Sequence, residues 1–147
     1  MNILAQINGY ALLAGLLVSA FIIVSLRSKH LKVTFRNYVI LLATFPVYYW
    51  WFSIYDGNVS ALLREVAIGL LFIVIAWLAY RLKLPVSALV LSFGFVAHGV
   101  YDFLHFALFE MTVAPAWWPE FCGVIDMLLG LYTLKILLTS KAKKLET

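Results

Sequence analysis

The sequence has little charge and almost no cysteine. Charged residues make up 12% of the 147 residues and hydrophobic residues 65%, whereas a soluble domain is about half apolar and about a quarter charged. The shortage of charge therefore excludes an ordinary water-soluble domain. The single cysteine, Cys122, rules out a disulfide within the chain.

Acidic residues are also scarce, and the formal net charge is +4. In a soluble chain, an excess of basic residues would suggest nucleic acid as a partner. Here the basic residues lie between long apolar blocks, so orientation in a membrane and contact with lipid headgroups explain them better. We therefore expect membrane lipid as a partner and no nucleic acid.

The apolar residues form five blocks, each long enough to cross a bilayer as a helix at about 1.5 Å per residue. Pro46 lies inside the second block and predicts a kink, because proline has no backbone N–H. The chain is expected to be a single all-α domain over residues 1–147, a transmembrane bundle of five helices. The expected spans are approximately residues 3–26, 33–55, 61–81, 86–109 and 119–138.

The basic residues predict the orientation of this bundle. With five spans, all but one of the 11 lysines and arginines fall on the side shared by the first turn, the third turn and the C-terminus, and only Arg64 falls opposite. Basic residues collect on the cytoplasmic side, so the pattern predicts an outside N-terminus and a cytoplasmic C-terminus. The residues on the basic side are Arg27, Lys29, Lys32, Arg36, Arg81, Lys83, Lys135, Lys141, Lys143 and Lys144.

Three ionisable residues, His98, Asp102 and His105, lie within the apolar block at 86–109. Their spacing of four and then three residues puts all three side chains on one stripe of a helix. Ionisable groups this deep in a membrane helix are costly and usually face a protein interior or a cavity. The stripe is therefore the strongest candidate for a functional site.

Other helices are expected to bring polar groups to the same depth. At about 1.5 Å per residue, Asp126 in the last block lies level with Asp102, and Glu65 lies in the first turns of the third block. Gly69 follows Glu65 by one turn and favours close approach of the helices. We expect these groups to meet in a pocket in the outer half of the membrane. Its expected ligand-binding residues besides the stripe are Glu65, Tyr48 and Tyr55.

Two imidazoles and several carboxylates suit a divalent transition metal such as Zn²⁺, Fe²⁺ or Mn²⁺. His98 and His105 stand about 10 Å apart along the helix axis. One ion would therefore use one histidine with Asp102 and Asp126, and two ions would use both histidines. The alternative is a hydrogen-bonded polar core without metal, with Arg64 as its basic partner. The predicted catalytic and metal-binding residues are His98, Asp102, His105 and Asp126.

Three classes of function remain open. The first is a metal-dependent enzyme, such as a hydrolase, that acts on a lipid or another hydrophobic small molecule. The second is a binding or transport module for a cation or for protons. The third is an accessory subunit whose polar cluster only holds helices together. A multi-pass location in a bacterial inner membrane is expected, and a homo-oligomer is left open.

The segments AHGVYDFLH and WWPEFCGVIDMLLGLY cover most of the fourth and fifth expected helices. They resemble small polytopic integral membrane proteins of bacteria whose function is unknown. The resemblance implies a bundle of membrane helices and no particular activity. The histidines and aspartates are also similar in kind to those of intramembrane metal hydrolases, although those have more spans and three histidines at one site.

Overall fold

A computed structural model describes residues 8–27, 30–109 and 113–145. These residues form six helices and no strand. The helices are α1 (Gly9–Leu26), α2 (Leu31–Thr44), α3 (Pro46–Tyr55), α4 (Val59–Arg81), α5 (Val86–Leu108) and α6 (Trp118–Leu145).

Five stretches among the described residues are long and apolar enough to cross a membrane, which confirms the all-α class and the expected number of spans. Helices α2 and α3 together make the second stretch, Lys32–Tyr55. The predicted start of the first span, at residue 3, lies outside the described residues. Helix α6 continues to Leu145, past the predicted end at 138. The prediction followed the apolar block, and the lysine and alanine residues after it favour helix as well.

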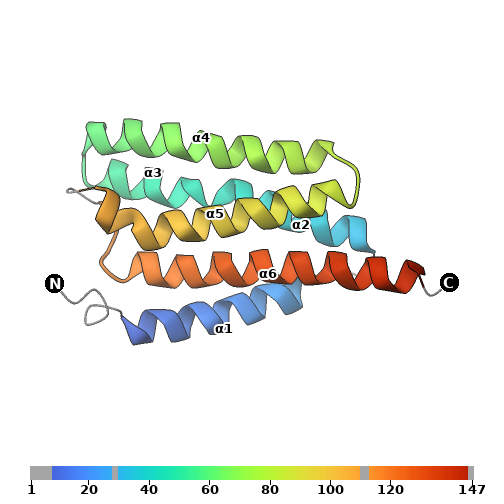
Figure 1. The fold of residues 1–147 in the computed structure, drawn as a ribbon. Coiled ribbons are helices and arrows are strands. Elements are labelled where there is room, and N and C mark those ends of the chain that lie inside the picture. The colour runs from blue at the N-terminus through green and yellow to red at the C-terminus, as the bar shows by residue number, and fades with distance from the viewer. Residues whose placement is uncertain (1–7, 28–29, 110–112, 146–147) are drawn as a thin grey trace.

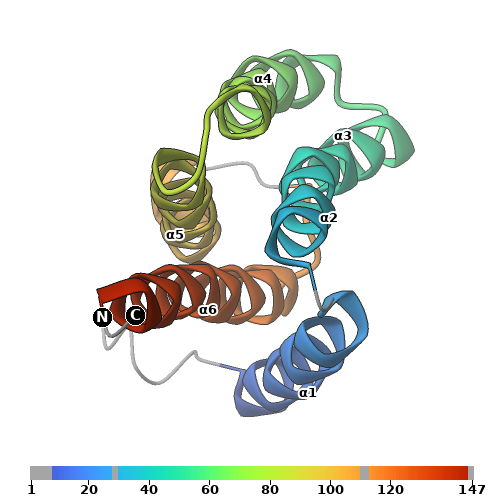
Figure 2. The same ribbon diagram turned by 90° about the vertical axis from the view of Figure 1, so that its right-hand side faces the viewer.

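The five spans lie side by side and alternate in direction along the bundle (Figure 1). The view along the bundle shows α5 between α4 and α6, with the α2–α3 span across from α5 and α1 outside, against α6 (Figure 2). The α3–α4 turn and the α5–α6 connection lie at one end, and the α4–α5 turn lies at the other. We call these the Asp56 end and the Lys83 end, after one residue in each turn.

Local sequence explains where the helices break. Pro46 is the first residue of α3, and α2 ends at Thr44, so the predicted kink is confirmed as a break between two helices. Gly57, in the turn after α3, has a φ of +68°, which glycine adopts without strain. Asn58 then caps α4, since its side chain accepts a 2.9 Å hydrogen bond from the backbone N–H of Ala61.

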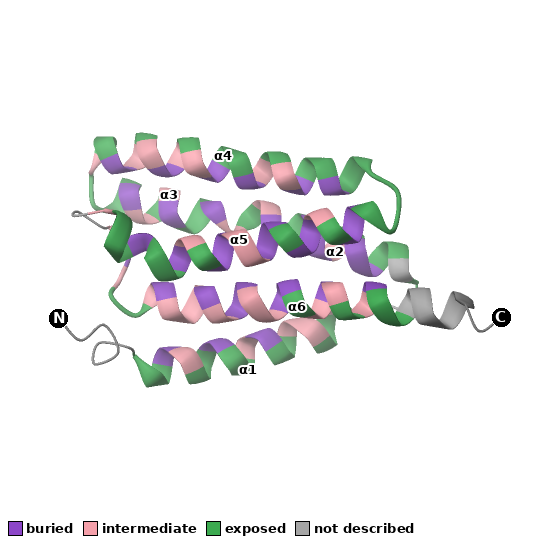
Figure 3. Cartoon of the chain, viewed as in Figure 1, coloured by how far each residue is buried: buried purple, intermediate pink, exposed green. Residues whose placement is uncertain are grey.

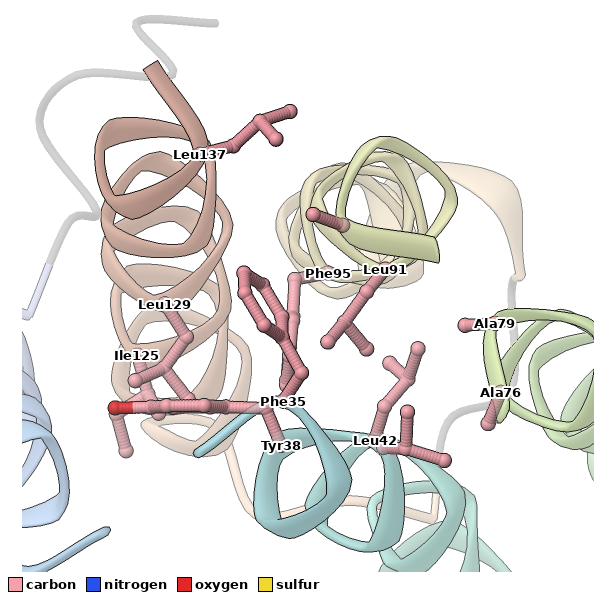
Figure 4. Packing of buried hydrophobic residues seen from close by; sticks show 12 residues of the cluster. Phe35, Tyr38, Leu42, Ala76, Ala79, Leu91, Phe95, Ile125, Leu129 and Leu137 are labelled. Carbon is pink, nitrogen blue, oxygen red and sulfur yellow. The ribbon is translucent and has the colours of Figure 1, made fainter. Parts of the chain in front are cut away.

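Buried residues follow the inward stripes of the helices, and exposed residues follow the outward ones (Figure 3). The main apolar cluster packs between α2, α4, α5 and α6 (Figure 4). Most of it lies in the half of the bundle toward the Lys83 end. Tyr38, Leu91 and Phe95 are completely buried there. The outward faces carry many exposed leucine, valine and phenylalanine side chains, which suits contact with lipid chains rather than water.

Candidate functional site

The predicted stripe of α5 is buried in the other half of the bundle, toward the Asp56 end. His98 is 2% exposed, and Asp102 and His105 are completely buried. All three side chains thus lie on the one face of α5 that points into the protein, as their spacing predicted. The two acidic residues expected to join them, Asp126 of α6 and Glu65 of α4, are also buried.

His98, Asp102 and Asp126 form one cluster between α5 and α6, which we call the His98 cluster. His98 Nδ1 lies 2.7 Å from Asp126 Oδ2 and 3.5 Å from Asp102 Oδ2. One ligand atom from each residue can be chosen so that all three lie within 4.8 Å of one another. An imidazole nitrogen with two carboxylate oxygens is a donor set that Zn²⁺, Fe²⁺ and Mn²⁺ accept.

Close contact between α5 and α6 assembles this cluster. A Cβ atom at Gly99 would lie 3.0 Å from the backbone oxygen of Gly123 and 3.1 Å from the Cβ of Asp126. Two turns further along, Ser92 Oγ donates a 2.7 Å hydrogen bond to the backbone oxygen of Gly130. Small residues at this interface therefore let the two backbones approach until His98 and Asp126 touch.

Two carboxylate oxygens of the His98 cluster have no hydrogen-bond partner among the described residues. They are Asp102 Oδ2 and Asp126 Oδ1, and both are fully buried. A buried carboxylate oxygen without a partner is costly in apolar surroundings. A cation held between the three side chains would satisfy both atoms, so the donor chemistry of this cluster fits a metal ion.

Tyr49 of α3 completes the cluster, although the sequence-based prediction did not include it. Its hydroxyl donates a 2.8 Å hydrogen bond to Asp102 Oδ1. Its ring stacks on the imidazole of His105, with the ring centroids 4.6 Å apart. Tyr49 therefore fixes the orientation of Asp102 and touches the second histidine of the stripe.

The two tyrosines predicted for the pocket lie elsewhere, which corrects their predicted placement. Tyr48 is 49% exposed and packs on Trp118, and Tyr55 is 87% exposed on the far turn of α3. Neighbouring residues of a helix point roughly 100° apart, so Tyr48 cannot share the inward face with Tyr49. The buried residues of α3 are Pro46, Tyr49 and Ser53.

Glu65 is the centre of a second cluster, nearer the Asp56 end, which we call the Glu65 cluster. Its Oε1 accepts a 3.0 Å hydrogen bond from Arg64 and lies 3.2 Å from His105 Nε2. Its Oε2 accepts a 2.5 Å hydrogen bond from the hydroxyl of Tyr101. The structure thus brings three of the four predicted metal ligands together and places His105 beside Glu65 instead.

Arg64 supplies the positive charge of the Glu65 cluster. It forms a 3.0 Å ion pair with Glu65, one of the two carboxylates that it was expected to neutralise. Its guanidinium carbon also lies 3.9 Å from the ring centroid of Phe109, a cation–π contact. Because the Arg64 side chain is 28% exposed, the Glu65 cluster reaches the surface of the bundle, whereas the His98 cluster is sealed inside it.

A small cavity lies between the two clusters, and its walls include Tyr49, Glu65, His98 and Tyr101. Its volume is about 10 Å³, which is the room that one water molecule needs. A water molecule or a small ion fits beside the His98 imidazole. A molecule of the size of a lipid does not fit there.

Tyr101 is the other polar residue that the sequence-based prediction missed. It follows His98 by three residues and precedes His105 by four, so its spacing alone places it on the predicted stripe. Its phenolic hydroxyl was the available clue, because a buried tyrosine hydroxyl usually finds a partner. In the structure that partner is Glu65.

No protein family, curated protein or solved structure matches this chain. The resemblance of the AHGVYDFLH and WWPEFCGVIDMLLGLY segments to small bacterial membrane proteins therefore stays a prediction. The argument about function consequently rests on the geometry of the two clusters.

Proposed function

We propose that this protein is a multi-pass membrane protein that binds a divalent transition metal ion through His98, Asp102 and Asp126. One observation carries the proposal: the three ligand atoms lie within 4.8 Å of one another while two buried carboxylate oxygens beside them lack hydrogen bonds. An imidazole with two carboxylates suits Zn²⁺, Fe²⁺ or Mn²⁺. Without a cation, one of the two carboxyl groups would have to carry a proton for those oxygens to be satisfied.

Cation binding is favoured over the other functions that the sequence left open. An enzyme acting on a lipid or another hydrophobic substrate needs room for that substrate beside the ion, and the cavity next to His98 has a volume of only about 10 Å³. A closed site of this kind suits the holding or passage of a small cation. The Glu65 cluster supports this function, since it connects the sealed site with the exposed side of Arg64.

The metal is tested on protein purified in detergent without chelators. The wild type is expected to contain or take up one ion per chain, and cobalt in its place should give visible absorption bands. His98→Gln should abolish the uptake. His105→Gln is the matched control, because it removes a buried histidine of the same stripe that bonds Glu65 rather than the proposed ion. If neither wild type nor His105→Gln takes up metal at neutral pH, the clusters are a hydrogen-bond network and the proposal is wrong.

We further propose that the N-terminus is outside and the C-terminus is cytoplasmic, in a bacterial inner membrane. The support is the ten-to-one distribution of basic residues, which puts Arg27, Lys32 and Lys83 on one side. The Lys83 end would then be cytoplasmic, and both polar clusters would lie in the outer half of the membrane.

Reporter fusions test this orientation. A fluorescent protein that matures only in the cytoplasm, fused after Thr147, should fluoresce, and alkaline phosphatase at the same position should stay inactive. The same two reporters placed in the Gly57 turn between α3 and α4 should give the opposite result. Active phosphatase at the C-terminus would contradict the proposed orientation.

A further inference from the structure

A cavity lies at the Lys83 end of the bundle, away from both polar clusters. It has a volume of about 520 Å³ and lies between the start of α2, the end of α4 and the start of α5. Ser87 lines it, and Ser87 lies about 16 Å along α5 from His98 at ~1.5 Å per residue. The apolar core of Figure 4 fills the space between, so this cavity is separate from the proposed metal site.

Three cationic side chains line this cavity: Lys32 and Arg36 from α2, and Lys83 from the α4–α5 turn. All three residues are exposed, and no carboxylate is among the lining residues. None of the three forms an ion pair with a described carboxylate. Their charges are therefore available to an anion from outside the chain.

Apart from the hydroxyl groups of Tyr80 and Ser87, the rest of the lining is apolar. Phe35, Val39 and Ala79 form buried surface in its wall, and Leu82 and Leu84 lie at its rim. A free phosphate or another small hydrophilic anion would gain nothing from these side chains. A phospholipid would use both parts of the lining, since its headgroup is anionic and its acyl chains are apolar.

The position of the cavity fits the same ligand. Lys32 opens the Lys32–Tyr55 span, and Lys83 stands between the spans that end at Arg81 and begin at Val86. The cavity thus lies at the ends of membrane-spanning helices, the depth at which lipid headgroups sit. Basic pockets between membrane helices bind anionic lipid headgroups.

We infer that the cavity lined by Lys32, Arg36 and Lys83 binds an anionic phospholipid, with its phosphate among the three cations and an acyl chain along Phe35 and Val39. The site is independent of the proposed metal site. It differs from general attraction of a basic surface to a membrane, because it requires these three side chains and not the others at the same end.

Native mass spectrometry of the detergent-purified protein tests the inference with phosphatidylglycerol and phosphatidylcholine as probes. The wild type should retain phosphatidylglycerol in preference to phosphatidylcholine. The double variant Arg36→Gln with Lys83→Gln should bind phosphatidylglycerol about 25-fold more weakly, at about fivefold per removed charge. Arg81→Gln is the matched control, because the Arg81 guanidinium lies over the Trp77 ring and is not part of the cavity lining. It should change binding by about twofold or less.

Three other results would overturn the inference. Equal binding of the two lipids, or an equal loss in Arg81→Gln, would overturn the inference in favour of unspecific attraction. The third is displacement of the lipid by inorganic phosphate at a concentration equal to that of the lipid. That result would show that the cavity binds the phosphate group alone, and it would also overturn the inference. The charge-preserving variant Arg36→Lys should keep the preference. An unchanged helical circular dichroism spectrum and elution as a single species should show that the double variant is folded.

Discussion

Replacing Asp102 with alanine should abolish metal binding, whereas replacing Glu65 with alanine should leave most of it. Asp102 offers one carboxylate oxygen to the His98 cluster and accepts the Tyr49 hydrogen bond with the other. Its removal takes away a ligand and releases Tyr49 at the same time. We expect a loss of affinity of more than about 100-fold, because outer-shell partners alone are worth about 10–100-fold.

Glu65 has a different place in the structure. Its carboxylate contacts Arg64, Tyr101 and His105, and none of these is a proposed ligand. Glu65→Ala should therefore lower the metal affinity by about tenfold or less, as expected for an outer-shell residue. Equilibrium dialysis against Zn²⁺ or Mn²⁺, on protein that elutes as a single species, measures both variants.

Two additional variants keep this comparison decisive. Asp102→Asn preserves the shape of the side chain, so it separates loss of a ligand from loss of the fold. Asp56→Asn changes an exposed carboxylate in the α3–α4 turn and should bind metal as the wild type does. Equal losses in Asp102→Asn and Glu65→Ala would show that the ion is not held by the His98 cluster.

The buried stripe could be predicted because its residues are unusual both in type and in spacing. Histidine and aspartate are rare in an apolar membrane helix, and their recurrence at three and four residues defines one face of it. Counting from the helix ends then placed Asp126 level with Asp102. The group of His98, Asp102 and Asp126 follows from these observations, whereas the helical class and the spans follow from the length of the apolar blocks.

The inward face of α3 could not be predicted in the same way. Its sequence, PVYYWWFSIY, consists almost entirely of aromatic and apolar residues, so no polar periodicity marks the side that faces the bundle. The structure turns Tyr49 inward, together with Pro46 and Ser53. Tyr49 there reaches Asp102 of α5, while Pro46 contacts Gly69 of α4. Tyr48 is also a tyrosine, but its side chain points about 100° away from that of Tyr49 around the helix axis.

The residue that each histidine contacts could also not be predicted from the sequence. His98 and His105 are two helical turns apart, so the same face of α5 meets α6 at one level and α4 at the other. Spacing determines which residues share a face, but the neighbour at each level depends on how the helices pack. This is why the stripe divides into the His98 cluster and the Glu65 cluster, with Tyr49 in contact with both.

The contact between α3 and α4 that positions Tyr49 depends on Gly69, and Gly69→Ala should weaken it. A methyl group at Gly69 would lie 2.7 Å from the Cβ of Pro46 and 2.8 Å from Nε1 of Trp50. That nitrogen donates a 2.9 Å hydrogen bond to the backbone oxygen of Glu65. The methyl group would therefore push α3 outward and strain the bond that ties α3 to α4.

The expected size of this effect follows from two opposing contributions. Overpacking costs about 1–3 kcal/mol, and the better helix propensity of alanine offsets about 0.5–1 kcal/mol of it. Thermal unfolding in detergent should show a midpoint several degrees lower for Gly69→Ala, together with weaker metal binding, because Tyr49 moves with α3 away from Asp102. Gly9→Ala is the matched control, since nothing lies within 4 Å of its added methyl group. If Gly69→Ala proved as stable as Gly9→Ala, α3 and α4 would not pack as closely as the structure has them, and Tyr49 would not be held against Asp102 by that contact.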